Sequence, residues 1–414
     1  MRGDPATETA GLDPETLARA AWSRVAEPGD VTAGSLIAAL GAGAALDWLR
    51  TAAAAVPGGR VRHAAADQAL DALADVAGPL DVSSRRRLAA GVERWAPRLA
   101  ALDPRRELRV LARLGGVLVH PGSRGWPAGL DDLGPAAPPC LWVRGDPDLG
   151  VGLDRSVALV GARAATGYGE RVAADLAGGL AERSFTVVSG GAYGIDAAAH
   201  RGALAVGGRT VVILAGGVDR PYPAGNADLL ARVLEAGGSV VSEVPPGSVP
   251  SKTRFLQRNR LIAAVGRATV VVEAAWRSGA LSTAGHAGAL LRPVGAVPGP
   301  VTSMASAGCH RLLRDGAAVC VTDAAEVAEL AGAAGADLAP ERTGAGADVD
   351  GLADSARKVL DALPVVRAAG TESLARAAGL SVAQVQAELG PLELVGLAER
   401  DGPGWRRRRR RARP

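Results

Sequence analysis

The chain has 414 residues, a formal net charge of +4, and a composition that is 48% hydrophobic but only 3% aromatic. This length predicts two to four domains with an ample core, and the ordinary apolar and charged fractions exclude a wholly disordered chain. No run of about 18 or more strongly apolar residues occurs, which excludes a membrane protein. Residues 1–13 lack the pattern of a secretory signal and the three cysteines are far apart, so we expect a cytoplasmic protein without a disulfide framework.

The excess positive charge is concentrated at one end of the chain. Residues 406–414 read RRRRRRARP and carry seven arginines, and removing those charges from the +4 total leaves −3 for the rest. Such a polybasic tail is a candidate contact for nucleic acid. Because only two of the 47 basic residues are lysines, a general preference for arginine explains the tail equally well.

Three regions follow one another along most of the chain. Residues 1–112 are predicted to form a helical domain, because apolar residues recur at helical spacing between Pro and Gly breaks. Residues 115–155 are rich in Gly and Pro and are expected to form a long irregular arm. From residue 156 short apolar runs alternate with helix-length segments, at 157–160, 186–188, 210–214, 239–242, 268–272 and 293–297. Strands alternating with helices predict an α/β domain over residues 113–330, built on a parallel sheet with helices on both faces.

The remaining residues are expected to form a second, smaller domain. Residues 331–351 are of low complexity and predict a linker, and residues 352–405 show three helical patterns followed by a strand pair, which is typical of a winged helix. Pro391 falls in or just after the second helix of this unit, where a proline costs about 3 kcal/mol unless the helix breaks. That helix has no Lys or Arg for phosphate contacts, so we expect an accessory or protein-contacting role.

Glycines and cations gather where the predicted strands end, which is where ligands bind to open parallel sheets. Glycine-rich turns follow the first two strands, at 161–169 and 189–196, and helix N-termini at such turns present N–H groups to an anion. Glycines alone would indicate only strand-to-helix turns. Six cations near these strand ends favour a phosphate-binding pocket instead, namely Arg163, Lys252, Arg254, Arg258, Arg260 and Arg277.

The common nucleotide-binding and metal-binding motifs are absent. Arg163 stands where the second glycine of a dinucleotide fingerprint must let pyrophosphate approach, and non-glycine residues replace both glycines of a P-loop before Lys252. Asp196 and His200 are four residues apart on a predicted helix, but the sequence offers no third metal ligand. We therefore expect these two residues to organise the pocket, and we expect no metal and no cofactor.

Phe255 is the most informative residue of the candidate pocket. It lies three residues from both Lys252 and Arg258 in a chain that is poor in aromatics. A cation for phosphate beside a ring for a base is the arrangement by which proteins bind single-stranded nucleic acid. The alternative is that Phe255 anchors its helix in the core. For Trp276, which precedes Arg277, core packing is the preferred interpretation.

Seven strings at the strand ends, taken in order, resemble the DNA-processing protein A family (DprA, also called Smf). They are VG(S/A)RxxTxYG at 160–169, SGxAxGID with AH at 189–200, GxDxxYPxxN at 217–226, SExPPG at 242–247, FPxRNRxIA at 255–263, VVEAxxRSG at 271–279 and VPG at 297–299. The resemblance runs from about Arg113 to Ala328 and is weaker on both sides. Leu256, Ala280 and His310 depart from the family pattern, and the last two are expected near the pocket rim.

The resemblance implies a Rossmann-like domain that binds single-stranded DNA, forms dimers and has no established catalytic activity. It also implies that the protein protects incoming single strands during natural transformation and hands them to the RecA recombinase. The implied DNA-pocket residues are Arg163, Ser189, Gly190, Lys252 and Phe255, with Arg163 and Lys252 on phosphates and Phe255 against a base. Three more residues are implied to hold the pocket together or to touch the DNA backbone, namely Arg258, Asn259 and Arg260.

Two other functions stay open at this point. A nucleotide or nucleoside-phosphate hydrolase on the same sheet gains support from Glu243, Glu273 and Asp196, each of which is able to act as a general base. A duplex-reading transcription regulator would need a basic recognition helix in residues 352–405, which the sequence lacks. The sequence therefore favours a non-catalytic binder of single-stranded DNA.

Overall fold

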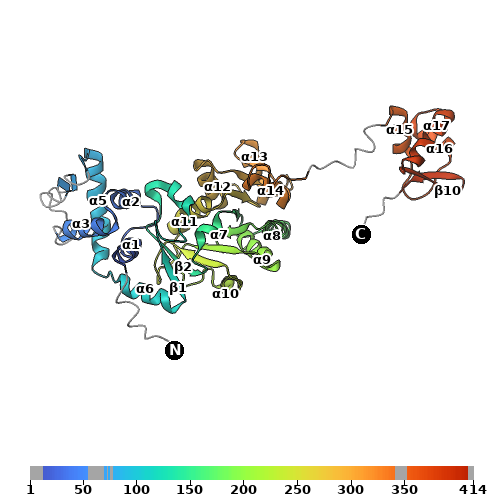
Figure 1. Ribbon diagram of the computed structural model, residues 1–414. Coiled ribbons are helices and arrows are strands. Elements are labelled where there is room, and N and C mark those ends of the chain that lie inside the picture. The colour runs from blue at the N-terminus through green and yellow to red at the C-terminus, as the bar shows by residue number, and fades with distance from the viewer. Residues whose placement is uncertain (1–12, 55–69, 72, 75–77, 341–351, 409–414) are drawn as a thin grey trace. The chain divides into compact units, whose positions relative to one another are not determined.

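The computed structural model describes residues 13–54, 70–71, 73–74, 78–340 and 352–408 (Figure 1). The chain divides into two compact units, Met1–Ala339 and Pro340–Pro414. The predictions made for residues 1–12, for residues 341–351 of the linker and for the last six residues of the Arg tail lie outside the described residues.

A nine-stranded sheet lies at the centre of the larger unit, in the order β1-β2-β6-β5-β4-β3-β7-β8-β9. The strands are β1 (Gly116–Val119), β2 (Leu141–Gly145), β3 (Ser156–Val160), β4 (Thr186–Ser189), β5 (Thr210–Leu214), β6 (Ser239–Ser242), β7 (Ala268–Val271), β8 (Val294–Ala296) and β9 (Val319–Cys320). Strands β3 to β8 are the six predicted apolar runs, and they pair in parallel. Each is buried along its whole length because helices cover both faces, so the Rossmann-like prediction is confirmed for this part of the sheet.

Residues 115–155 are not the irregular arm that their Gly and Pro content predicts. They supply β1 and β2, which pair antiparallel with each other, and β2 pairs antiparallel with β6. The sheet is therefore mixed, and parallel only from β6 to β9. The apolar run of β2 is only three residues long and follows Pro138 and Pro139, so pairing with β6 decides its conformation more than local propensity does.

Helices cover the two faces of the sheet (Figure 1). One face carries α8 (Gly167–Glu182), α9 (Ile195–Ala205), α10 (Ala227–Glu235) and α14 (Ala324–Ala331), whose apolar residues meet strands β3 to β7. The other carries α7 (Leu149–Leu153), α11 (Lys252–Val265), α12 (Ala280–Ala289) and α13 (Ala307–Arg314). Short 3₁₀ turns complete the connections, at η2 (Ala128–Ala136), η3 (Ala224–Asn226) and η4 (Met304–Ser306).

The order of the strands creates a crevice above β3. The chain runs from β3 through β4 and β5 to β6, and α11 then carries it back to β7 on the opposite side of β3. Strands β3 and β7 are neighbours that pair, for example, at Val160 and Val271. The connections that leave these two strands therefore diverge from each other. In open α/β sheets this reversal of strand order is where ligands bind.

The helical N-terminal region packs against the sheet as well as on itself. It contains α1 (Pro14–Val25), α2 (Val31–Leu40), α3 (Ala42–Ala54), α5 (Val82–Leu99) and α6 (Pro104–Arg113). Trp22 and Trp95 meet edge to face at 5.6 Å in its core. The indole Nε1 of Trp142 on β2 donates to Ser23 Oγ at 3.1 Å, which ties α1 to the sheet. Among the described residues no single helix is long and apolar enough to cross a membrane; α2 and α3 together reach that measure but meet at a 115° bend.

The smaller unit contains α15 (Asp354–Ala362), α16 (Thr371–Ala378), α17 (Val382–Leu394) and the hairpin of β10 (Ala398–Asp401) and β11 (Gly404–Arg407). Helix α17 begins with a capping box between Ser381 and Gln384 and continues through Pro391, which lies in its last turn. It is the third helix of this unit, and not the second as the sequence predicted. Arg406, the first residue of the predicted Arg tail, lies in β11 and pairs with Glu399 across the hairpin at 2.8 Å. The wing is thus longer than the sequence predicted.

Candidate nucleic-acid interface

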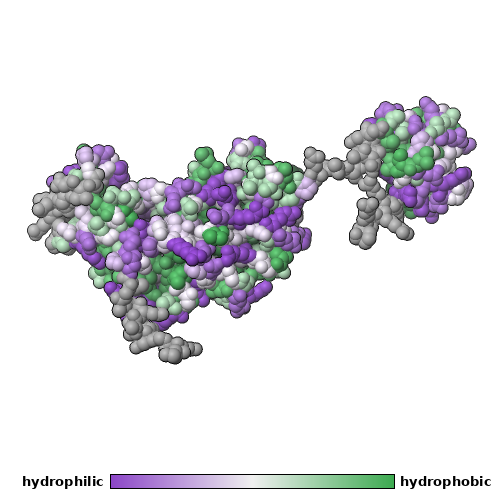
Figure 2. Space-filling model, in the orientation of Figure 1, coloured by the Kyte–Doolittle hydropathy of each residue, from purple (hydrophilic) through white to green (hydrophobic). Residues whose placement is uncertain are grey.

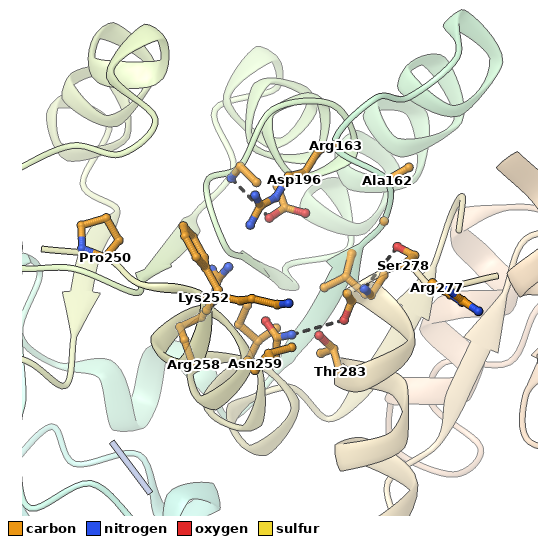
Figure 3. A pocket seen from close by; sticks show the side chains of 18 of the residues that line it. Ala162, Arg163, Asp196, Pro250, Lys252, Arg258, Asn259, Arg277, Ser278 and Thr283 are labelled. Carbon is orange, nitrogen blue, oxygen red and sulfur yellow. Dashed lines mark hydrogen bonds between the residues drawn. The ribbon is translucent and has the colours of Figure 1, made fainter. Parts of the chain in front are cut away.

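A pocket of about 740 Å³ lies in the crevice at the carboxyl ends of β3 and β7 (Figure 3). Its walls are the connections after β3 and β4, the first three turns of α11, and the connection between β7 and α12. Pockets that hold small ligands or single nucleotides have volumes of this order. The surface view shows hydrophilic residues gathered across the middle of the larger unit, between α11 and α8 (Figure 2).

An arginine and a phenylalanine from two facing walls stack at the pocket. The guanidinium carbon of Arg163, which follows β3, lies 4.6 Å from the ring centroid of Phe255 in α11. Tyr222 meets the same ring at 5.6 Å with the planes tilted by 52°. Ser251 caps α11 by accepting from the Arg254 N–H, which fixes where Phe255 enters the pocket. Phe255 therefore lies at the ligand side of α11 and not in the core.

The start of α11 carries cations where a helix dipole favours acids. Lys252 is the first residue of the helix and extends into the space beside Thr283 (Figure 3), while the first turn contains no acidic residue. Arg254 is neutralised by Glu27, whose carboxylate accepts from it at 3.0 and 3.1 Å. Lys252, Arg163 and Arg277 form no ion pair with any residue that the structure describes. An anion in the pocket would balance all three charges.

Two buried charged groups form the floor of the pocket. Arg258 is only 5% exposed and donates to the carbonyl of Ile213 at 2.5 Å, while its Nε finds no partner among the described atoms. Asp196 accepts from the Gly190 and Ala192 N–H groups at 3.2 and 3.3 Å. Burial raises the pKa of Asp196 and lowers the pKa of Arg258 to about 10, so the guanidinium keeps its charge at neutral pH.

Five of the eight residues implied by the resemblance line this pocket, namely Arg163, Lys252, Phe255, Arg258 and Asn259. Ser189 and Gly190 lie buried outside its lining, and the Ser189 hydroxyl donates to the carbonyl of Leu159 at 2.6 Å. Arg260 is buried and donates to both oxygens of Glu243 at 2.8 and 2.6 Å. The contacts of Ser189 and Arg260 are those of residues that hold the walls together.

Sequence reasoning missed several residues of the pocket. Tyr222, Ser278, Gly279 and Thr283 belong to the lining, and the string that follows β7 was a usable signal for two of them. The preference for Trp276 in the core was wrong, because this side chain is 46% exposed. Trp276 lies in a turn after the end of β7. In such a turn the apolar character of a residue does not predict whether its side chain is buried.

The carboxylates considered as general bases are engaged in the framework. Glu273 accepts from the Thr166 N–H and hydroxyl at 2.9 and 2.6 Å, and Glu243 is held by Arg260. His200 is buried, its Nδ1 lies 2.7 Å from the hydroxyl of Thr210, and its Nε2 has no partner among the described atoms, so it shares no hydrogen bond with Asp196. Burial lowers the pKa of His200 to about 3. Among the described residues no group of three or more His, Cys, Asp or Glu is placed to hold a metal ion.

The model of the family described as DNA recombination-mediator protein A matches residues 117–332, which is more than half of the chain. The chain belongs to this family. A model of the DprA winged helix domain matches residues 343–404, which confirms the predicted fold of the smaller unit.

Individual relatives show the same membership, one of them over nearly the whole chain. A Mycobacterium tuberculosis protein that carries the DprA name is 45% identical over 406 residues, which is 95% of each chain. The DNA processing protein DprA of Streptococcus pneumoniae is 38% identical over 194 residues, covering 47% of this chain and 67% of that one. The X-ray structure of the S. pneumoniae protein matches with a TM-score of 0.52 and 30% identity, over 68% of this chain and 95% of that one. The likeness thus includes the helical N-terminal region.

Proposed function

We propose that this chain binds single-stranded DNA in the pocket above β3 and β7. Arg163 and Lys252 take phosphates, and a base stacks against Phe255. The observation that carries the proposal is the contact of Arg163 with Phe255 at 4.6 Å, next to a lysine that has no ion-pair partner among the described residues. Aromatic rings stack on any base and cations follow any backbone, so this chemistry predicts binding that is sensitive to salt and tolerant of sequence.

The contact between Arg163 and Phe255 also indicates how the ring becomes accessible to a base. The Arg163 guanidinium covers one face of the Phe255 ring in the chain without DNA. A phosphate of the strand competes with the ring for this guanidinium, because a charge-assisted hydrogen bond is stronger than a cation–π contact at an exposed site. Arg163 then moves to the phosphate and leaves the ring face to the base.

Binding without catalysis is part of the proposal. Glu243 and Glu273 each accept two hydrogen bonds inside the framework, and Asp196 accepts two from backbone N–H groups. All three carboxylates are thus held by hydrogen bonds within the protein framework. Incubation with nucleoside monophosphates should release neither base nor phosphate, and release of either would favour the hydrolase alternative instead.

Phe255→Ala and Lys252→Ala provide the direct test. Loss of one stacked base costs about 1–3 kcal/mol, so Phe255→Ala should weaken single-strand binding by roughly 5- to 100-fold. Lys252→Ala should weaken binding and flatten its salt dependence. Lys358→Ala is the matched control, because the exposed Lys358 is the only other lysine of the chain. Fluorescence anisotropy with a labelled oligonucleotide and unlabelled duplex competitor measures all three, and parent-like binding of both pocket variants would contradict the assignment.

We further propose that the bound strand is passed to the RecA recombinase in the cytoplasm, as part of natural transformation or recombination, and that the chain acts as a dimer. The family description as a recombination mediator supports this proposal. RecA filament assembly on strands covered by a single-strand binding protein should be faster with the parent chain than with Lys252→Ala. Light scattering tests the dimer, and protection of single strands from nuclease tests the protective role.

The winged unit is proposed to contact protein or to play an accessory role. Its helix α17 has no Lys or Arg, and its exposed face carries Val382, Gln386 and Leu394. A groove-reading helix brings cations to the phosphates, so duplex reading by this helix has no support from its sequence. Equal duplex affinity with and without residues 352–405, with the terminal arginines kept in both chains, is the expected result.

A further inference from the structure

An exposed tryptophan lies beside the pocket, in the connection between β7 and α12. The Ser278 N–H donates to the carbonyl of Ala275 at 3.0 Å, which closes a turn with Trp276 and Arg277 at its two corners. Trp276 is 46% exposed. Arg277 lines the pocket on the side opposite Pro250, and its guanidinium is turned away from Lys252 (Figure 3).

The turn rests on a rigid base, helix α13. The Gly308 N–H donates to the carbonyl of Ala274 at 2.6 Å, and a Cβ at Gly308 would lie 2.6 Å from the same oxygen. The start of α13 therefore packs directly on the backbone that precedes Trp276. One turn further along α13, the guanidinium carbon of Arg311 lies 5.7 Å from the Trp276 ring centroid. Trp276 is thus held from one side by a cation.

The same pairing of an arginine with an aromatic ring occurs in the pocket and again beside it. Arg163 lies over Phe255 on the α11 side, and Arg311 lies over Trp276 on the α13 side. Asp196 is the one acidic residue in the lining between them, and it is buried and hydrogen-bonded to backbone N–H groups. A single exposed aromatic is common on protein surfaces, but a tryptophan that contacts Arg311 and is followed in sequence by the pocket residue Arg277 has the composition of a base-stacking site.

We propose that Trp276, with Arg277 and Arg311, is a second base-stacking platform that carries the single strand out of the pocket towards α13. This inference rests on the proposed function. The strand would stack one base on Phe255, cross the pocket with its phosphates near Lys252 and Arg277, and stack a later base on Trp276. Short oligonucleotides reach only one platform, whereas longer ones reach both.

Length dependence is the test. Affinities of the full chain, Trp276→Ala, Trp276→Phe and Phe255→Ala are measured by anisotropy with oligothymidylates of about 4 to about 20 nucleotides, a range that spans common site sizes. Val206→Ala is the control, because Val206 is 45% exposed beyond the opposite ends of the strands. Trp276→Ala should weaken binding of the longest oligonucleotides by about 5- to 100-fold and leave the shortest unchanged. Trp276→Phe keeps a ring and should retain most of the affinity. Part of the tryptophan fluorescence quenched by DNA in the parent should be missing in Trp276→Phe.

The outcomes separate this inference from the proposed function. Parent-like affinity of Trp276→Ala at every length, together with weakened binding by Phe255→Ala, overturns the second platform and keeps the pocket. The second platform is also overturned if Trp276→Ala weakens DNA binding equally at all oligonucleotide lengths, or if Trp276→Phe binds as weakly as Trp276→Ala. In either case the tryptophan would act on the shape of the pocket and not by stacking on a base. Parent-like binding by Phe255→Ala at all lengths is a failure of the proposed function itself. Thermal melts confirm that each variant is folded.

Discussion

At the scale of single residues, the pocket depends on a buried glycine that lies outside its lining. A Cβ built on Gly190 would lie 1.8 Å from Nη1 of Arg258, so the buried guanidinium fills the space that this glycine leaves. The same pattern recurs at Gly169, where a Cβ would lie 2.3 Å from Oε2 of Glu273. These glycines make room for buried charges beneath the pocket, a reason that the turn motif alone does not reveal.

Gly190→Ala should therefore be costly although it adds a single methyl group. The Arg258 guanidinium is buried and held by the Ile213 carbonyl, so it cannot move without losing that bond, and we expect a loss of about 1–3 kcal/mol in the free energy of unfolding. Gly285→Ala in α12 is the matched control, because its Cβ meets nothing within 4 Å and alanine stabilises a helix by about 1 kcal/mol relative to glycine. Urea unfolding measures both, and equal stability of the two variants would contradict the role given to Gly190.

At the scale of elements, helices α1 and α6 meet the loop after β6 at one arginine. Arg24 on α1 donates to Glu107 on α6 at 2.5 Å and to the carbonyl of Pro246 at 2.8 Å. The second carboxylate oxygen of Glu107 is buried without a partner among the described atoms. Burial raises the pKa of Glu107 although Arg24 opposes it. The same loop leads into α11, so this junction supports the wall of the pocket.

Arg24→Ala should destabilise the chain most at neutral pH. It leaves a largely buried carboxylate unpaired, at a cost of about 1–3 kcal/mol. Since the folded pKa of Glu107 is raised, protonation relieves that cost as the pH falls from 7 towards the ordinary value of 4.5. The difference in melting temperature from the parent should therefore shrink between pH 7 and pH 5. The control Arg50→Ala removes an exposed pair and should cost less than about 1 kcal/mol at either pH. A deficit that is constant with pH would contradict the role of Glu107.

The sequence predicts strands well where every residue of the strand is buried, and poorly where pairing with another strand determines the conformation. Strands β3 to β8 are apolar throughout because both of their faces are covered, and their positions were predicted to within about one residue. Strand β2 depends on antiparallel pairing with β6 and strand β1 on antiparallel pairing with β2, and no local pattern encodes either. In the site, Lys252 and Phe255 could be found from charge and aromaticity. The burial of Arg260 against Glu243, 17 residues away along the chain, and the exposure of Trp276 are set by tertiary contacts.

At the scale of the whole molecule, the positive charge divides between the pocket and the end of the chain. Arg163, Lys252 and Arg277 are the exposed cations of the pocket lining, and none of them has an ion-pair partner among the described residues. Arg406, by contrast, is already paired with Glu399 in the wing. Residues 409–414 add four more arginines. Salt dependence separates the two sources, because each phosphate neutralised on a single strand contributes about −0.7 to the slope of log K against log salt.

A chain that ends at Arg408 keeps β11 complete and removes four arginines. If three pocket cations hold the strand, the slope of log K against log salt for this shortened chain should be about −2. The shortened chain should also still prefer single strands to duplex in a competition titration at two salt concentrations. Lys252→Ala in the same shortened chain should reduce the slope by about 0.7. If the slope for the full chain is steeper than that for the shortened chain, by up to about 3, the terminal arginines also contact phosphates. An unchanged slope would mean that they reflect only the preference of this chain for arginine. Loss of single-strand preference on truncation would instead place binding in the tail and leave the pocket for a small anionic ligand.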